Sequence, residues 1–125
     1  MTDAVHGACL CGAVRFTAQV GRREVRPCVC TQCQRQNSAV WLDVPSARDI
    51  RWQGTPATYR ASDKATRGFC ARCGTTLYWQ ADGEAPALNH GILAERDGWR
   101  LLATEYEGDG PDVFRVVAAT GKDRG

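Results

Sequence analysis

Seven cysteines constrain this chain more than any other feature, and they fall into three short clusters: Cys9 and Cys11, then Cys28, Cys30 and Cys33, then Cys70 and Cys73. A closed structural zinc site uses four protein ligands, whereas a catalytic zinc site keeps three protein ligands and one exchangeable position. One closed site and one open site would use every cysteine in the chain. This division favours a metal-dependent enzyme over a simple zinc ribbon.

Other uses of the cysteines remain open from the sequence alone. A disulfide framework would leave one of the seven cysteines unpaired, and the close spacing within each cluster would close very short loops. Thiolates also hold iron–sulfur clusters. The chain could instead carry one zinc site and three buried thiols that bind no metal, or use the thiols in redox chemistry.

Length and composition indicate a globular protein with one domain, over residues 1–125 and with a core at about residues 5–105. The chain is 43% hydrophobic and 24% charged, and its formal charge is +2. This charge is too small to indicate a nucleic-acid partner by itself. No apolar run approaches the roughly 18 residues of a membrane span, and the start lacks the features of a signal peptide. We therefore expect a cytoplasmic protein with no membrane partner.

The hydrophobic pattern predicts short strands rather than long helices. Residues 14–20 alternate apolar and polar side chains, and residues 75–79 are rich in β-branched and aromatic ones. Each segment begins just after a cysteine pair and a glycine, so we expect the two strands to pair and their cysteines to share one ion. Further strands are predicted at 40–44, 49–52, 57–60, 66–69, 87–93 and 99–103, with a last apolar run at 113–119.

Only two helical turns are predicted, at 31–38 and 46–49, and residues 121–125 are expected to form a frayed tail. The predicted fold class is therefore mostly β: a small antiparallel domain held together by zinc, with at most short helical turns.

The spacing also predicts a role for each cysteine set. The pairs Cys9/Cys11 and Cys70/Cys73 can converge on one ion, which we predict to be structural. Cys28, Cys30 and Cys33 form a compact C-x-C-x-x-C motif, hereafter the cysteine claw. No histidine or carboxylate close in sequence offers the claw a fourth ligand, so a water or a substrate thiolate could take that position.

Three segments resemble the glutathione-dependent formaldehyde-activating enzyme family, which includes centromere protein V. They are residues 7–16 (GACLCGAVRF), 28–33 (CVCTQC) and 68–75 (GFCARCGT). The resemblance implies a β-tent fold, with a structural zinc on Cys9, Cys11, Cys70 and Cys73 and a catalytic zinc on Cys28, Cys30 and Cys33. It also implies carbon–sulfur lyase chemistry on a glutathione-like adduct of a small aldehyde, such as reversible S-hydroxymethylglutathione formation.

Other side chains are candidates for substrate binding. Four arginines lie near the claw in sequence and could bind substrate carboxylates, although each alone is more typical of a solvated surface charge: Arg22, Arg23, Arg26 and Arg35. His90 is a candidate proton shuttle. Two other classes of function stay open: a zinc-stabilised module that binds protein or nucleic acid, and a sensor that releases metal on oxidation.

Overall fold

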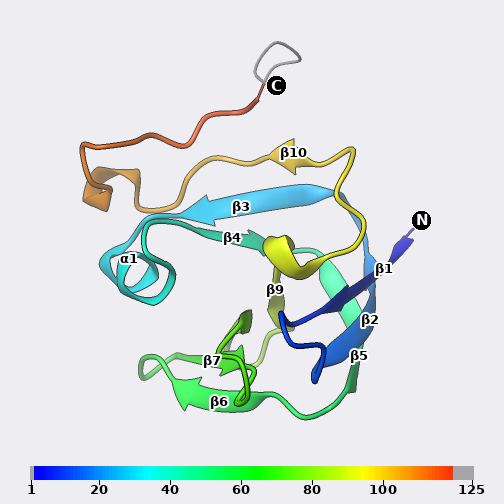
Figure 1. Ribbon diagram of the computed structural model, residues 1–125. Coiled ribbons are helices and arrows are strands. Elements are labelled where there is room, and N and C mark those ends of the chain that lie inside the picture. Colours follow the sequence, from blue (N-terminus) through cyan, green and yellow to red (C-terminus); the bar gives the residue numbers. More distant parts are fainter. Residues whose placement is uncertain (1, 120–125) are drawn as a thin grey trace.

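The computed structural model describes residues 2–119, which form ten β-strands, one α-helix and two short 3₁₀ helices (Figure 1). The strands are β1 (Asp3–Ala8), β2 (Arg15–Val20), β3 (Glu24–Cys28), β4 (Trp41–Val44), β5 (Ala47–Gln53), β6 (Ala57–Arg60), β7 (Ala65–Phe69), β8 (Thr76–Ala81), β9 (Ala87–Asn89) and β10 (Arg100–Leu101). The helices are α1 (Thr31–Asn37), η1 (His90–Ile92) and η2 (Glu107–Asp109). The predicted tail at 121–125 lies outside the described residues.

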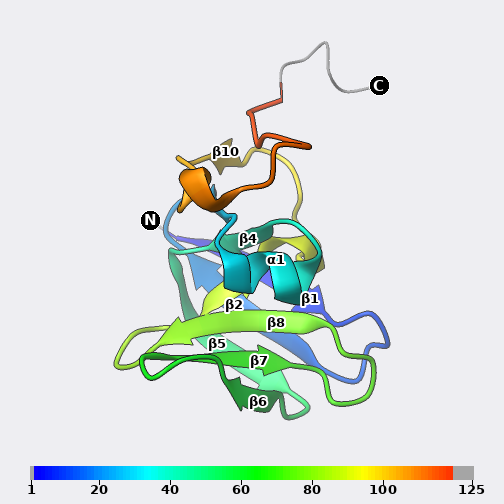
Figure 2. The ribbon, with the colours of Figure 1, turned by 90° about the vertical axis from the view of Figure 1, so that its left-hand side faces the viewer.

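The strands form two sheets. The small sheet has the order β1-β2-β5, and the large sheet has the order β10-β3-β4-β9-β8-β7-β6. All pairs are antiparallel except β10 with β3. Figure 1 shows β3 and β4 on one side of the molecule and β6 and β7 on the opposite side, and Figure 2 shows α1 in front of the space between them. The predicted fold class, a mostly β antiparallel domain with short helical turns, is confirmed.

The core lies between the small sheet and one face of the large sheet. Its members are buried apolar residues from both sheets: Val5, Val14, Phe16, Ala18, Val20, Val44, Ala47, Leu77, Tyr78, Leu88 and Leu93, with Cys9 and Cys70. The alternation predicted for residues 14–20 is present in β2, where Phe16, Ala18 and Val20 are buried. A strand can pack against a core in this way when every second side chain is apolar, as in β2.

The opposite face of the large sheet, hereafter the outer face, carries Arg26 and Cys28. Val44, Leu88 and Tyr78 pair across β4, β9 and β8 and point into the core. Because side chains alternate along a strand, their neighbours Asp43, Ala87 and Trp79 point to the outer face. Arg26 pairs with Asp43, and Cys28 lies two residues beyond Arg26 on the same strand. The register therefore places Arg26 and Cys28 on one face.

Several sequence-based boundaries agree with the structure. The predicted strands 57–60 and 66–69 correspond to β6 and β7, and the predicted turn at 31–38 is α1. The predicted strand at 40–44 is β4, and that at 75–79 overlaps β8, which begins one residue later and continues to Ala81. Strand type is recognisable here because the strand segments are short, contain β-branched or aromatic residues and are bounded by turn residues.

Other expectations were wrong. Residues 14–20 and 75–79 do not pair, because β2 lies between β1 and β5 whereas β8 lies between β9 and β7. The turn predicted at 46–49 is instead the start of β5. Residues 87–93 are a strand only to Asn89 and then form η1, and residues 113–119 are not in a strand.

The predicted strand at 99–103 is reduced to the two residues of β10, and the sequence reading missed β1 and β3. In β1 only Val5 is buried, so the strand signal is weak. β3 alternates between buried and half-buried residues, but it is only five residues long and contains Pro27, which is uncommon inside strands. Within residues 2–119, none of the helices has the length and apolar character that a membrane-spanning helix requires.

Candidate metal centres

The structure brings Cys9, Cys11, Cys70 and Cys73 together. Their four Sγ atoms lie within 4.8 Å of one another, although Cys11 and Cys70 are 59 residues apart in the sequence. The Sγ atom of Cys11 is 3.7 Å from that of Cys9 and 3.8 Å from that of Cys70. In a tetrahedron with zinc–sulfur bonds of about 2.3 Å, the sulfur–sulfur edge is about 3.8 Å. The four thiols therefore fit a single four-coordinate ion.

The two cysteine pairs share one backbone design. The N–H of Cys9 donates to the carbonyl of Val14 at 2.9 Å, and the N–H of Cys70 donates to the carbonyl of Thr75 at 2.9 Å. Gly12 and Gly74 follow the second cysteine of each pair with φ of 78° and 81°. Glycine adopts this left-handed conformation without the steric cost that a side chain would impose. Each pair is thus a tight turn, or knuckle, that holds two sulfurs side by side.

Hydrogen bonds to sulfur prepare these thiols to bind a cation. The N–H of Val14 donates to Cys9 Sγ and the N–H of Cys73 donates to Cys70 Sγ, both at 3.4 Å. The Thr75 hydroxyl lies 3.1 Å from Cys73 Sγ and, with backbone N–H groups of Thr75 and Cys11, lowers the pKa of Cys73 to about 5. A thiolate is the form of cysteine that binds metal, so this environment favours a ligand at neutral pH.

The cysteine claw forms the second cluster. The Sγ atoms of Cys28, Cys30 and Cys33 also lie within 4.8 Å of one another. Cys28 ends β3, Cys30 is the N-cap of α1, and Cys33 lies in the first turn of that helix. Cys30 Sγ accepts a hydrogen bond from the N–H of Cys33 at 3.4 Å. The strand end and the helix start therefore aim three sulfurs at one point.

The three claw thiols differ in their electrostatics. Burial raises the pKa of Cys28. Burial and then the two neighbouring thiols raise the pKa of Cys33. Burial alone would raise the pKa of Cys30. The hydrogen bond from the N–H of Cys33 and the neighbouring thiols outweigh burial, so the pKa of Cys30 is lowered. A cation at the centre of the claw would relieve the crowding of the three sulfurs.

No histidine or carboxylate within residues 2–119 joins the three claw sulfurs as a fourth ligand atom. This donor set fits a soft metal ion such as zinc that keeps one position open. The Sγ atoms of each cluster lie within 4.8 Å of one another. This spacing is too small for the thiols to surround an iron–sulfur cluster of several iron atoms and sulfides. Each cluster could therefore hold a single ion.

Asp43, the nearest carboxylate downstream of the claw in sequence, has another role. It is 3% exposed, and its oxygens accept hydrogen bonds from Arg26 Nε at 3.2 Å, Arg26 Nη2 at 3.1 Å and Trp41 Nε1 at 2.9 Å. Burial raises the pKa of Asp43, and Arg26 opposes this effect. Because Trp41 pairs with Cys28, this network supports the strand pair that carries the claw. Sequence reasoning missed it, since it depends on the β3–β4 register.

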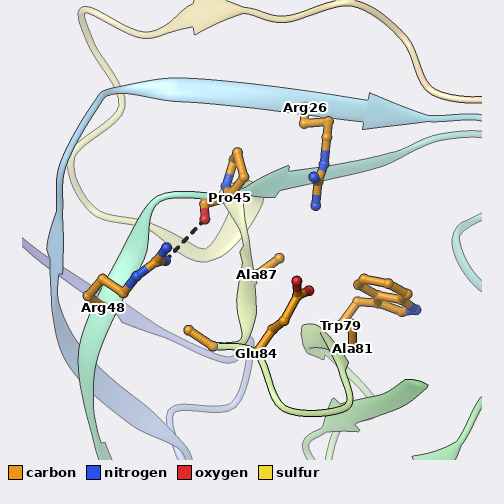
Figure 3. A pocket seen from close by; sticks show the side chains of 8 residues that line it. Arg26, Pro45, Arg48, Trp79, Ala81, Glu84 and Ala87 are labelled. Atoms are coloured by element: carbon orange, nitrogen blue, oxygen red, sulfur yellow. Dashed lines mark hydrogen bonds between the residues drawn. The ribbon is translucent and has the colours of Figure 1, made fainter. Parts of the chain in front are cut away.

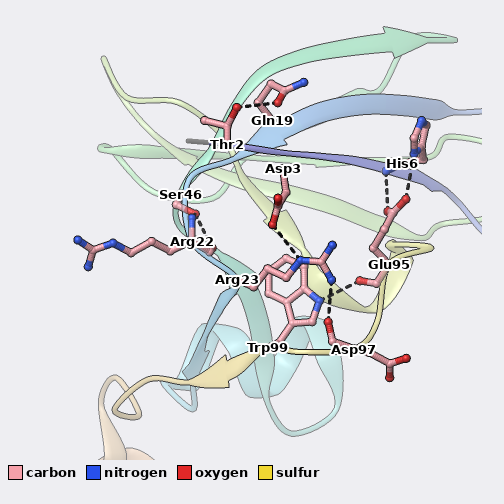
Figure 4. A network of polar contacts seen from close by, with 10 residues as sticks. All are labelled: Thr2, Asp3, His6, Gln19, Arg22, Arg23, Ser46, Glu95, Asp97 and Trp99. Carbon is pink, nitrogen blue, oxygen red and sulfur yellow. Dashed lines mark hydrogen bonds and ion pairs between the residues drawn. The ribbon is translucent and has the colours of Figure 1, made fainter.

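The other predicted binding residues are only partly brought to the claw. Arg23 donates to Asp3 at 3.2 Å and to the carbonyl of Asp97 at 2.7 Å, and its guanidinium lies 5.7 Å from the centre of the Trp99 ring (Figure 4). Arg22 lies at the β2–β3 turn, where its N–H bonds Ser46. Both arginines lie before β3, whereas the claw begins at its end. Arg26 is on the same face as Cys28, and Arg35 lies in the last turn of α1.

The two histidines lie apart from the claw cysteines. His6 Nδ1 is 2.9 Å from a Glu95 oxygen (Figure 4). His90 packs edge-on against Trp99, with ring centres 5.0 Å apart, and its buried Nε2 has no partner within residues 2–119. Burial lowers the pKa of His90. The predicted shuttle role of His90 stays untested.

Comparison with known proteins agrees with this geometry. A crystal structure of a Rhodobacter sphaeroides protein superposes with a TM-score of 0.58 and 28% sequence identity, over 72% of this chain and 88% of the other. A family model described as glutathione-dependent formaldehyde-activating enzyme matches residues 4–109, which include both cysteine clusters. With that match over most of its length, the chain belongs to the glutathione-dependent formaldehyde-activating enzyme family.

Proposed function

We propose that this protein is a zinc-dependent carbon–sulfur lyase acting on the adduct of glutathione, or a similar thiol, with a small aldehyde. Formation and cleavage of S-hydroxymethylglutathione is the model reaction. The family name supports an enzyme that uses formaldehyde and glutathione. The observation that carries the proposal is the claw, whose three sulfurs lie together without a fourth histidine or carboxylate ligand among residues 2–119.

The two clusters would have different roles. Cys9, Cys11, Cys70 and Cys73 would hold a structural zinc ion, because four ligands complete its coordination. Cys28, Cys30 and Cys33 would hold the catalytic zinc ion and leave one position for the substrate sulfur. Bound zinc supplies Lewis acidity that keeps a coordinated thiol in its thiolate form at neutral pH.

The reaction then needs little from the protein besides positioning. The thiolate sulfur attacks the carbonyl carbon of the aldehyde, a C–S bond forms, and the carbonyl oxygen takes up a proton to give a hemithioacetal. In reverse, the hydroxyl loses its proton, the C–S bond breaks and the thiolate is restored. Cys28 on β3 and Cys33 on α1 would orient the sulfur, while the Arg26–Asp43 pair would keep the β3–β4 strand pair rigid.

The cysteines also suggest where the protein works. All seven are free thiols in the structure. Metal-binding thiols persist in reducing compartments, so we place the protein in the cytoplasm.

The proposal is tested with Cys30→Ser, with zinc content per chain and adduct formation from formaldehyde and glutathione as the measurements. We expect two zinc ions in the wild type and about one in the variant. Turnover should fall at least about 100-fold, because loss of a ligand should cost no less than loss of a group that only orients a ligand, which typically costs about 10- to 100-fold. Circular dichroism should show an intact fold. Gln36→Ala, in α1 but outside the claw, is the control and should keep both ions. Unchanged zinc content and turnover in Cys30→Ser would rule out the catalytic assignment.

A further inference from the structure

A pocket of about 320 Å³ lies beside the claw strand on the outer face of the large sheet (Figure 3). Six of the residues that line it are Arg26, Arg48, Trp79, Ala81, Glu84 and Ala87. The side chains of Arg26 and the claw residue Cys28 point to the same face of β3. Their Cα atoms are about 7 Å apart, given the usual rise of a strand. A molecule bound through sulfur at the claw could therefore extend into this pocket.

Arg48 is held in place at one side of the pocket. Its Nη1 donates to the carbonyl of Pro45 at 3.2 Å and to that of Ala47 at 2.6 Å. Nε and Nη2 have no partner within residues 2–119, so they are available to a carboxylate. The register shifts between Thr17 and Gln19 opposite this part of β5, and Asp49 has φ of 53°. Such bulges redirect side chains, often next to functional sites.

Glu84 supplies the opposite charge. Its carboxylate points into the space between Arg26, Arg48 and Trp79 (Figure 3). No hydrogen bond or ion pair engages this carboxylate within residues 2–119. Arg26 is already committed to Asp43 through Nε and Nη2, which leaves Arg48 as the better donor to an incoming anion.

The remaining lining is apolar. The half-buried Trp79 ring and the side chains of Ala81 and Ala87 form a surface against which methylene groups can pack. The pocket thus combines a cationic group, an anionic group and an apolar wall. A free α-amino acid group carries the complementary charges, because its carboxylate can pair with arginine and its ammonium with a carboxylate.

We infer that this pocket binds the γ-glutamyl end of the thiol substrate, with Arg48 on the α-carboxylate and Glu84 on the α-ammonium group. The inference rests on the proposed function, since it identifies the thiol that the claw would receive. A γ-glutamyl residue keeps both groups free, whereas an ordinary N-terminal residue loses its carboxylate to the peptide bond. The chain from the cysteine sulfur of glutathione to the α-carbon of its glutamyl residue extends about 9 Å. This is longer than the separation of about 7 Å between the Cα atoms of Cys28 and Arg26, so a thiol held at the claw can reach past Arg26.

The test measures binding by NMR, without turnover. The probes are S-methylglutathione, which cannot form a thiolate, and its glutaryl analogue, which lacks only the ammonium group. We expect the wild type to bind S-methylglutathione at least tenfold more tightly than the analogue, with a shift of the Trp79 indole signal. Glu84→Gln should abolish this discrimination. Arg48→Gln should weaken the binding of both probes at least tenfold. Arg51 is an exposed arginine of the same strand, and Arg51→Gln should change the affinity for neither probe.

Three outcomes would overturn the inference: no detectable binding of S-methylglutathione, equal affinity for the two probes, or equal effects of Arg48→Gln and Arg51→Gln. Measuring adduct formation and the KM for glutathione distinguishes an error in the pocket assignment from an error in the proposed function. If Glu84→Gln formed the formaldehyde adduct with an unchanged KM for glutathione, the lyase function would stand and the pocket would be wrong. If the wild type bound S-methylglutathione as expected but formed no adduct, the pocket would stand and the lyase function would be wrong.

Discussion

Thr75 shows how a residue that binds no metal can control a metal site. Its hydroxyl lies 3.1 Å from Cys73 Sγ and also accepts the N–H of Leu10 at 3.1 Å, so it joins the two knuckles. It is the largest cause of the lowered pKa of Cys73. Groups of this kind typically change metal affinity by about 10- to 100-fold.

We therefore predict that Thr75→Val weakens zinc binding at the four-cysteine site, more strongly at pH 6 than at pH 8. With a pKa of about 5, Cys73 is a thiolate at both pH values. In the variant its pKa rises toward the ordinary value of 9.0, so zinc must displace a proton, at a cost that grows as the pH falls. Competition with a chromophoric chelator measures the affinity. A loss equal at both pH values would contradict the role of the hydroxyl.

At the scale of elements, β7 and β8 connect the second knuckle to the pocket. Gly68 on β7 pairs with Tyr78 on β8, and a Cβ atom at Gly68 would overlap the Tyr78 ring. That ring lies in the core and stacks at a tilt on Trp52, with ring centres 5.7 Å apart. Glycine at this position therefore leaves the space that the Tyr78 ring occupies.

We predict that Gly68→Ala destabilises the protein by about 2–3 kcal/mol, because the Tyr78 ring must leave its place in a close-packed core. Denaturant unfolding followed by circular dichroism measures the loss. Gly108→Ala is the control, since a Cβ atom there meets no neighbour within 4 Å, and it should change stability by less than about 0.5 kcal/mol. Equal stability of the two variants would exclude the packing argument.

At the scale of the whole molecule, the two clusters differ in what they connect. Cys9 and Cys11 follow β1 of the small sheet, whereas Cys70 and Cys73 lie between β7 and β8 of the large sheet. An ion shared by these four thiols joins the two sheets and closes a long loop, which stabilises the folded chain. The claw joins only the end of β3 to the start of α1, which follow each other directly in the sequence, so its ion should add much less.

Replacing a ligand in each cluster tests this difference. We predict that Cys70→Ser lowers the free energy of unfolding by at least about 3 kcal/mol, a part of what structural zinc contributes to small domains. Cys33→Ser should lower it by less than about 1 kcal/mol, as for a partly exposed position. Both are measured in zinc-containing buffer by urea unfolding. A similar loss in the two variants would show that the four-cysteine site has no special structural role.

The sequence by itself determined the three clusters of cysteines and the mostly β character of the chain. Spacing within a cluster is local, so its two or three sulfurs lie close together, and the match to the family model agrees. The meeting of the two knuckles depends on the fold, because Cys11 and Cys70 are 59 residues apart in the sequence. The single domain over residues 1–125 stays a prediction.

Only the tertiary structure decided which strands pair and which side chains meet. Residues 14–20 and 75–79 carry similar patterns, yet β2 and β8 belong to different sheets. Arg26, Arg48 and Glu84 come from β3, β5 and the segment between β8 and β9, and no sequence spacing links them. Pairing between distant strands depends on how all the apolar faces are buried at once, and that balance is a property of the folded chain.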